Sequence, residues 1–206
     1  MDFFTRIRKH FIKNPPPVEF HVATTEDIQA IFGGENTTGV SMRKISWEEY
    51  HELNVIRSMW GDESADLLSQ RSADVAREPT NAEAHFELGM FYYDHQLLEQ
   101  ARPCLEMATV LQPTHADAHH FLGHLESLYM ADGNDAELER LGITPDTVIA
   151  HYNKAIELNT SEMQYALHNR GVAHLVNDHR ELARQDLLAA EKLGNKAAGE
   201  ILKQQF

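Results

Sequence analysis

Two glycines set the strongest constraint on how this chain folds. Gly89 and Gly123 lie 34 residues apart, and each follows a leucine within a pattern of helical period. A fixed period of this length is typical of helix pairs stacked side by side. Such a stack has an extended concave face and usually no dedicated reaction centre, so the spacing favours a binding protein over an enzyme.

The residues around these glycines are those expected where two antiparallel helices touch. Small residues let the two backbones approach, and larger apolar residues fill the seam between them. In the first copy these residues are Leu88, Gly89, Tyr92, Ala101, Leu105, Ala108 and Pro113. A later copy has Gly171, Ala183, Leu187 and Ala190, with the same offsets of 12, 16 and 19 residues from the glycine. The pattern resembles the tetratricopeptide repeat family, and the resemblance implies an all-α, right-handed superhelix.

The middle copy is longer than the other two. Its glycine, Gly123, is matched to Tyr152 and Ala155, which leaves 13 extra residues between the two helices. We place this insertion at about 131–143, where a turn sequence at 132–135 precedes a short helix from Ala136 to Leu141. Thr144 is the predicted N-cap of the helix that follows, with Pro145 in its first position.

The last copy departs from the pattern at its seam. Arg170 replaces the leucine before the glycine, and His174 replaces the tyrosine after it. We therefore expect the first helix of this repeat to be less securely packed than its counterparts.

The sequence divides into four parts under this interpretation. Residues 1–45 form a basic amphipathic helix and an irregular extension, with a short helix from about Thr25 to Phe32. A degenerate helix pair at 46–80, opened by a capping box at Ser46, serves as an N-terminal cap. Three repeats follow at 81–194, and a helix at 195–206 covers the last apolar face.

Composition limits the kind of partner and the compartment. The net charge of −14 disfavours nucleic acid, whose phosphates the chain would repel, and favours basic or apolar partners. The single cysteine, Cys104, excludes an intrachain disulfide, and no apolar run is long enough for a membrane span. We expect a cytoplasmic protein with an inert cysteine.

The resemblance implies a peptide-binding groove on the first helices of the repeats. The residues three before, one after and four after each glycine are expected to face it. They are Phe86, Met90 and Tyr93, then His120, His124 and Ser127, then His168, Val172 and Leu175. An apolar and histidine-rich groove of this kind suits the anchoring of apolar side chains. The alternative is that Phe86, Met90 and Tyr93 pack against the helices before them. A carboxylate clamp, which some members of the family use, does not fit these residue types.

A crowded set of histidines carries a second hypothesis. The pairs His115/His119 and His120/His124 each have the one-turn spacing that can chelate a metal. Neither pair contains the glutamate of a zinc protease, and we expect the two pairs to face different ways. The alternative to an interaction protein is thus a metal-responsive protein that uses the His115–His124 cluster. We find no phosphate loop, nucleophile elbow or zinc-binding cysteine pair, and predict no enzyme activity, no catalytic residues and no cofactor.

The N-terminal residues suggest further contacts. Residues 1–13 carry four basic side chains against one acidic side chain, alternating with Phe3, Phe4, Ile7, Phe11 and Ile12. This segment is predicted to dock on protein or, weakly, on an anionic membrane surface. It also raises the alternative of a self-associating scaffold, in which the helix of one chain fills the groove of another. The leading hypothesis is a non-enzymatic adaptor or assembly chaperone that captures a peptide segment of a protein partner.

Overall fold

The computed structural model describes residues 47–132 and 135–206, with side chains from Glu52 onward. The helices predicted at 1–13 and 25–32, and the capping box at Ser46, lie outside the described residues. The described residues are helical and contain no strand. Their helices are α3 (Trp47–Trp60), α4 (Asp62–Arg77), α5 (Ala82–Asp94), α6 (Leu98–Leu111), α7 (Ala116–Asp132), α8 (Asp135–Leu141), α9 (Pro145–Glu157), α10 (Met163–Val176), α11 (Arg180–Lys192) and α12 (Lys196–Gln205).

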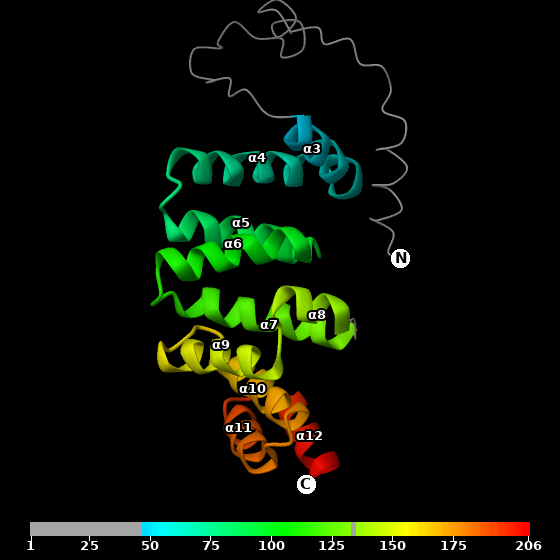
Figure 1. Ribbon diagram of the computed structural model, residues 1–206, viewed down its shortest axis with the longest axis vertical. Coiled ribbons are helices and arrows are strands. Elements are labelled where there is room, and N and C mark those ends of the chain that lie inside the picture. The colour runs from blue at the N-terminus through cyan, green and yellow to red at the C-terminus, as the bar shows by residue number, and fades with distance from the viewer. Residues whose placement is uncertain (1–46, 133–134) are drawn as a thin grey trace, which may run out of the picture. The chain divides into compact units, whose positions relative to one another are not determined.

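These helices form a stack of antiparallel pairs within the unit Ser46–Phe206 (Figure 1). The pairs are α3 with α4, α5 with α6, α7 with α9, and α10 with α11. Each pair also contacts the next through α4 with α5, α6 with α7, and α9 with α10, and α12 packs on α11. The all-α fold predicted from the sequence, a stack of paired helices, is confirmed.

The repeat glycines lie where two helices of a pair approach closely. A Cβ atom added at Gly89 would stand 3.0 Å from the side chain of Leu105, and one added at Gly171 would stand 3.0 Å from the side chain of Leu187. At Gly123 the nearest atoms belong to His151 and Tyr152, at 3.2 and 3.3 Å. The close approach therefore occurs in all three pairs, and the insertion does not disturb it in the middle one.

The turn between α5 and α6 has the same backbone conformation as the turn between α10 and α11. Gln96 and Asp178, each seven residues after its glycine, have left-handed φ angles of 60° and 57°. Their conformation lets the next amide bond back to the helix, from Leu97 N to Tyr92 O and from His179 N to His174 O, at 2.8 Å in both turns. Such bonds satisfy carbonyls at the helix C-terminus that have no partner within the helix.

The seam of the α10–α11 pair is polar where that of the α5–α6 pair is apolar. Arg170 donates hydrogen bonds from Nε and Nη2 to the two oxygens of Asp186, at 2.7 and 2.6 Å. His174 is buried, and its Nε2 lies 3.9 Å from the same carboxylate. A bidentate ion pair thus occupies this seam in place of apolar contacts, and the less secure packing expected from the sequence stays a prediction.

The segment between α7 and α9 folds as the short helix α8 and a capped connection. Thr144 and Thr147 cap α9 reciprocally, each side chain accepting the other's backbone N–H at 3.2 and 3.0 Å. Pro145 takes the first helical position, where no amide hydrogen is needed. Leu138 and Leu141 pack against the core that contains Ile143 and Val148, so α8 covers part of the middle pair.

The C-terminal helix α12 places Ala198, Ile201 and Leu202 against a core cluster formed with Leu187 and Ala190. Asn195 caps this helix by accepting from the backbone N–H of Ala198. The division into 1–45, 46–80, 81–194 and 195–206 stays a prediction. No helix in the described part of the chain is long and apolar enough to cross a membrane.

Candidate functional site

A pocket of about 360 Å³ opens between the first helices of successive pairs. Four of the nine predicted groove residues line it: Tyr93 from α5, His120 and His124 from α7, and His168 from α10. The pocket thus draws on three pairs that follow one another in the stack (Figure 1). Its other lining residues are Phe121, Glu162, Tyr165, Asn169, Asn195 and Ala197.

The other five predicted residues do not line this pocket. Phe86 packs against the core of the first pairs, with its ring centroid 4.5 Å from that of His115, and Met90 is partly buried. Ser127 donates to the carbonyl of Gly123 within its own helix at 2.8 Å. Leu175 packs against the C-terminal core, and Val172 is partly buried outside the pocket lining. A role for these five in binding stays a prediction.

A hydrogen bond across two pairs fixes one histidine of the pocket. The Tyr93 hydroxyl on α5 bonds to Nδ1 of His124 on α7. If the hydroxyl is the donor, Nδ1 is the acceptor and the neutral ring carries its hydrogen on Nε2. Burial lowers the pKa of His124, and the charge of His168 lowers it further. The imidazole is therefore neutral near pH 7.

His120 is the most enclosed of the pocket histidines, with 4% of its surface exposed. Its ring is parallel to that of His124, with centroids 6.5 Å apart, and Nδ1 is buried with no hydrogen-bond partner in the described structure. Burial, with a smaller contribution from His124, lowers the pKa of His120 to about 4. A buried polar atom without a partner costs free energy, and Nδ1 of His120 shares this condition with Nδ1 of His119 and His174, which do not line the pocket.

His168, on α10, also has a buried ring nitrogen without a partner. This nitrogen is Nδ1, and burial lowers the pKa of the ring. Glu162 is the one carboxylate among the lining residues, and no lysine or arginine is among them. At neutral pH the pocket consequently combines uncharged imidazoles, aromatic rings and a single negative charge.

The other histidine pair has different surroundings. Nδ1 of His115 accepts from the backbone N–H of Ala118 at 3.2 Å, so Nε2 faces Glu83, 3.2 Å away, as the donor. His119 donates from Nε2 to the carbonyl of Pro113 at 3.1 Å. Among the described residues, no three His, Cys, Asp or Glu side chains are grouped to hold a metal ion. The His115–His124 cluster therefore supplies pairs of imidazoles without a third ligand in this part of the chain.

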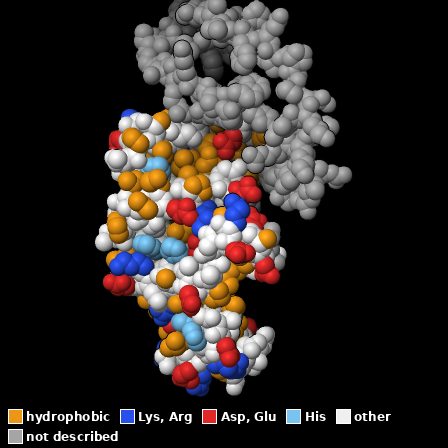
Figure 2. All heavy atoms as spheres, viewed as in Figure 1, with side chains coloured by type: hydrophobic (Ala, Val, Ile, Leu, Met, Phe, Trp, Pro, Cys, Tyr) orange, Lys and Arg blue, Asp and Glu red, His pale blue; other side chains and the backbone are white. Residues whose placement is uncertain are grey.

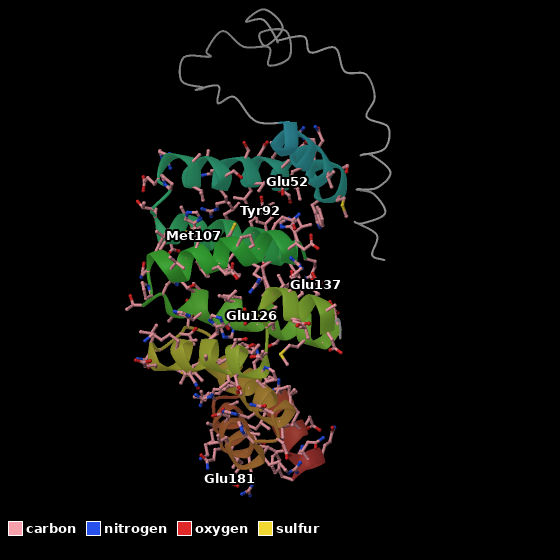
Figure 3. All side chains as sticks on the ribbon, viewed as in Figure 1. Glu52, Tyr92, Met107, Glu126, Glu137 and Glu181 are labelled. Carbon is pink, nitrogen blue, oxygen red and sulfur yellow. The ribbon has the colours of Figure 1, made fainter. Side chains whose placement is uncertain are left out.

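A second polar cluster lies on another side of α7, around Glu126 (Figure 3). Its side chain is 5% exposed and lies 3.5 Å from Nη2 of Arg102 and 3.7 Å from Nε2 of His151. Burial raises the pKa of Glu126 despite the opposing charge of Arg102. Burial also lowers the pKa of His151 to about 4. In Figure 2, pale-blue histidine side chains gather near α7 and α9.

Sequence reasoning missed six lining residues. Tyr165 on α10 and Glu162, the N-cap residue of this helix, lie three and six residues before His168, so extending the expected groove to the N-cap of each first helix would have found them. Phe121 lies next to His120, two residues before Gly123, a position that the expected groove offsets do not include. Asn195 and Ala197 come from the start of α12, which the pattern describes only as a cap.

These features define a helical-repeat protein with a pocket on the first helices of its pairs.

No protein-family model matches the sequence, and no curated protein matches it. Among solved structures, two crystal structures of MamA have 20% and 19% identity, with TM-scores of 0.49 and 0.48. They cover 73% and 76% of this chain and are themselves covered over 79% and 74%. The crystal structure of the P58(IPK) TPR domain has 16% identity and a TM-score of 0.30, covering 76% of this chain and 63% of that one.

Proposed function

We propose that this chain is a non-enzymatic adaptor or assembly chaperone that binds a peptide segment of a protein partner in the pocket between α5, α7 and α10. The observation that carries the proposal is the pocket itself, in which aromatic rings lie beside the buried, unpartnered Nδ1 atoms of His120 and His168. A peptide supplies both kinds of group that such a surface requires, namely apolar side chains and hydrogen-bonding amides.

The aromatic residues provide the anchoring surface. Tyr93 and Phe121 pack edge to face with centroids 5.5 Å apart, and Tyr165 is 48% exposed at the pocket. Rings held by such contacts lose little conformational freedom on binding, so their burial contributes efficiently to affinity.

Panning a random dodecapeptide library on the full chain tests the proposal directly. The pocket variant replaces Tyr165 and His168 with alanine, and neither side chain is fully buried. The control variant replaces Leu182 and His179, both exposed on or beside α11 and outside the pocket lining. Leu182 has the same 48% relative exposure as Tyr165, and each double substitution removes one large side chain and one histidine.

We expect enriched peptides to bind the wild type and the control variant alike. They should bind the pocket variant about tenfold more weakly, as the loss of one aromatic anchor predicts. Far-ultraviolet circular dichroism of both variants should match the wild type. Failure to enrich any peptide, or enriched peptides that bind the pocket variant undiminished, would overturn the proposal.

The contacts proposed for residues 1–13, with a membrane surface or with a second copy, concern residues outside the described part and stay predictions. Sizing the full chain against a chain that lacks residues 1–13 tests self-association. An oligomer that becomes a monomer on truncation supports it, and the same monomer in both cases excludes it.

A further inference from the structure

The pocket lining has one acidic residue, Glu162, and no lysine or arginine. Glu162 is partly buried and forms no ion pair within the described residues, whereas the buried carboxylates of Asp186 and Glu126 have Arg170 and Arg102 nearby. Lys196 lies between the lining residues Asn195 and Ala197 in sequence, but it is exposed and is not part of the lining. The pocket thus presents a carboxylate with no lysine or arginine in its lining.

The polar atoms of the pocket point to a hydrogen-bond donor as ligand. A neutral imidazole keeps a lone pair on one nitrogen, so His120 and His168 each offer an acceptor. Both rings have a buried Nδ1 without a partner, and the side chain of Glu162 adds acceptor oxygens. A ligand with several N–H groups would satisfy these atoms, whereas a purely apolar ligand would bury them unpaired at a cost.

The rings of the pocket favour a positive charge. Tyr93, Phe121 and Tyr165 present aromatic surfaces, whose faces attract a cation. A guanidinium stacks on such faces and carries five N–H donors in one plane. An anionic ligand would instead meet the carboxylate of Glu162 with no lysine or arginine in the lining to offset it.

We infer that the pocket takes a basic side chain, arginine foremost, presented by the docked segment of the partner. The guanidinium would lie against the aromatic rings, with its N–H groups towards Glu162 and the free imidazole nitrogens. This inference rests on the proposed function and adds to it the chemical class of the anchoring residue. The net charge of −14 acts in the same direction by attracting basic segments over a longer range.

Small probes test the inference separately from peptide capture. N-acetyl-arginine amide, N-acetyl-norleucine amide and N-acetyl-glutamate amide are each titrated into the full chain while the histidine ring signals are followed by NMR. We expect the arginine probe to shift the signals of His120, His124 and His168 at about fivefold lower concentration than norleucine, as a partly desolvated cation–π contact predicts. The glutamate probe should leave these signals unchanged.

A matched pair of variants locates the charge that is responsible. Glu162→Gln should reduce the affinity for the arginine probe to about that for norleucine and leave norleucine binding unaltered. Glu181→Gln, at an exposed glutamate on α11 outside the lining (Figure 3), should change neither. Added salt should weaken arginine binding to the wild type and to Glu181→Gln, and much less to Glu162→Gln.

The outcomes separate the two proposals. If norleucine binds as well as arginine, or if no probe shifts the pocket histidines, the inference is wrong, while library panning still decides the proposed function. If arginine binds selectively but no library peptide does, the proposed function is wrong and the site for a cationic group remains.

Discussion

Arg170 on α10 and Asp186 on α11 form a bidentate ion pair at a seam that another repeat fills with Leu88 and Cys104. The two pairs have the same offsets, one residue before the repeat glycine and fifteen after it. Both members change together, so a polar pair replaces an apolar pair at one position in the stack. The side chains of Arg170 and Asp186 are 20% and 9% exposed, and removing only one of them strands a poorly solvated charge.

Arg170→Leu should therefore destabilise the chain by about 2–4 kcal/mol, since Asp186 loses its partner in an enclosed site. The double substitution Arg170→Leu/Asp186→Cys restores the residue types of the first repeat and should recover most of this loss. Urea unfolding of the wild type, the single variant and the double variant measures both effects. A double variant no more stable than Arg170→Leu would show that the seam does not accept an apolar pair.

Gly171→Ala should lower stability although alanine favours helix. The new Cβ would stand 3.0 Å from Leu187 and 3.3 Å from the carbonyl of Ala183, which is backbone and does not yield easily. We expect a loss of about 1–2 kcal/mol, since overpacking outweighs the helix-propensity gain of about 1 kcal/mol.

Gly199→Ala provides the matched control in another helix. There the Cβ would meet the end of the flexible Glu191 side chain, which can rotate away. This variant should keep or gain stability, and thermal melts compare the two. Equal gains at both positions would contradict the close approach at Gly171.

Acid should destabilise the fold partly through His120. Its pKa is about 4 in the folded chain and about 6.5 when unfolded, so the unfolded chain binds the additional proton as pH falls. The contribution is nil above about pH 7 and grows between about pH 6.5 and pH 4. His120→Gln should lose about 2 kcal/mol less than the wild type between pH 7.5 and pH 4.5, in urea unfolding at each pH. Identical losses in both proteins would show that the histidine is hydrated in the folded state.

Arg102 connects the first repeat with the segment between α7 and α9. Its Nη2 donates to the carbonyl of Leu141 at 3.0 Å and lies 3.5 Å from Oε1 of Glu126. Arg102→Ala should destabilise the chain by about 2–3 kcal/mol and speed amide hydrogen exchange in α8, since a buried carboxylate loses its cation.

Two further variants check that explanation. Adding Glu126→Gln to Arg102→Ala should restore part of the stability, because the stranded charge is then absent. Arg184→Ala, at an exposed arginine of α11, should be nearly neutral. Exchange in α8 that stays at the wild-type rate in Arg102→Ala would contradict the anchoring contact.

The repeat glycines were sufficient to predict the pairing of helices, because the close approach of two backbones demands small residues at fixed offsets. Gly89 with Leu105 and Gly171 with Leu187 are such cases. The pocket was only partly predictable. The offsets selected Tyr93 and three histidines that line one pocket, but they could not report that Phe86 and Leu175 pack against cores outside its lining. Glu162 was missed because the offsets begin at His168, six residues after this N-cap residue of α10.

The pocket walls come from elements as far apart in the chain as Tyr93 on α5 and Ala197 on α12. No single hairpin encloses the cavity, so it exists only while the C-terminal pairs remain docked to those before them. Helical arrays of this kind fray from their ends. A ligand bound in this pocket would contact several pairs at once, and its binding would stabilise the C-terminal helix pairs against local unfolding.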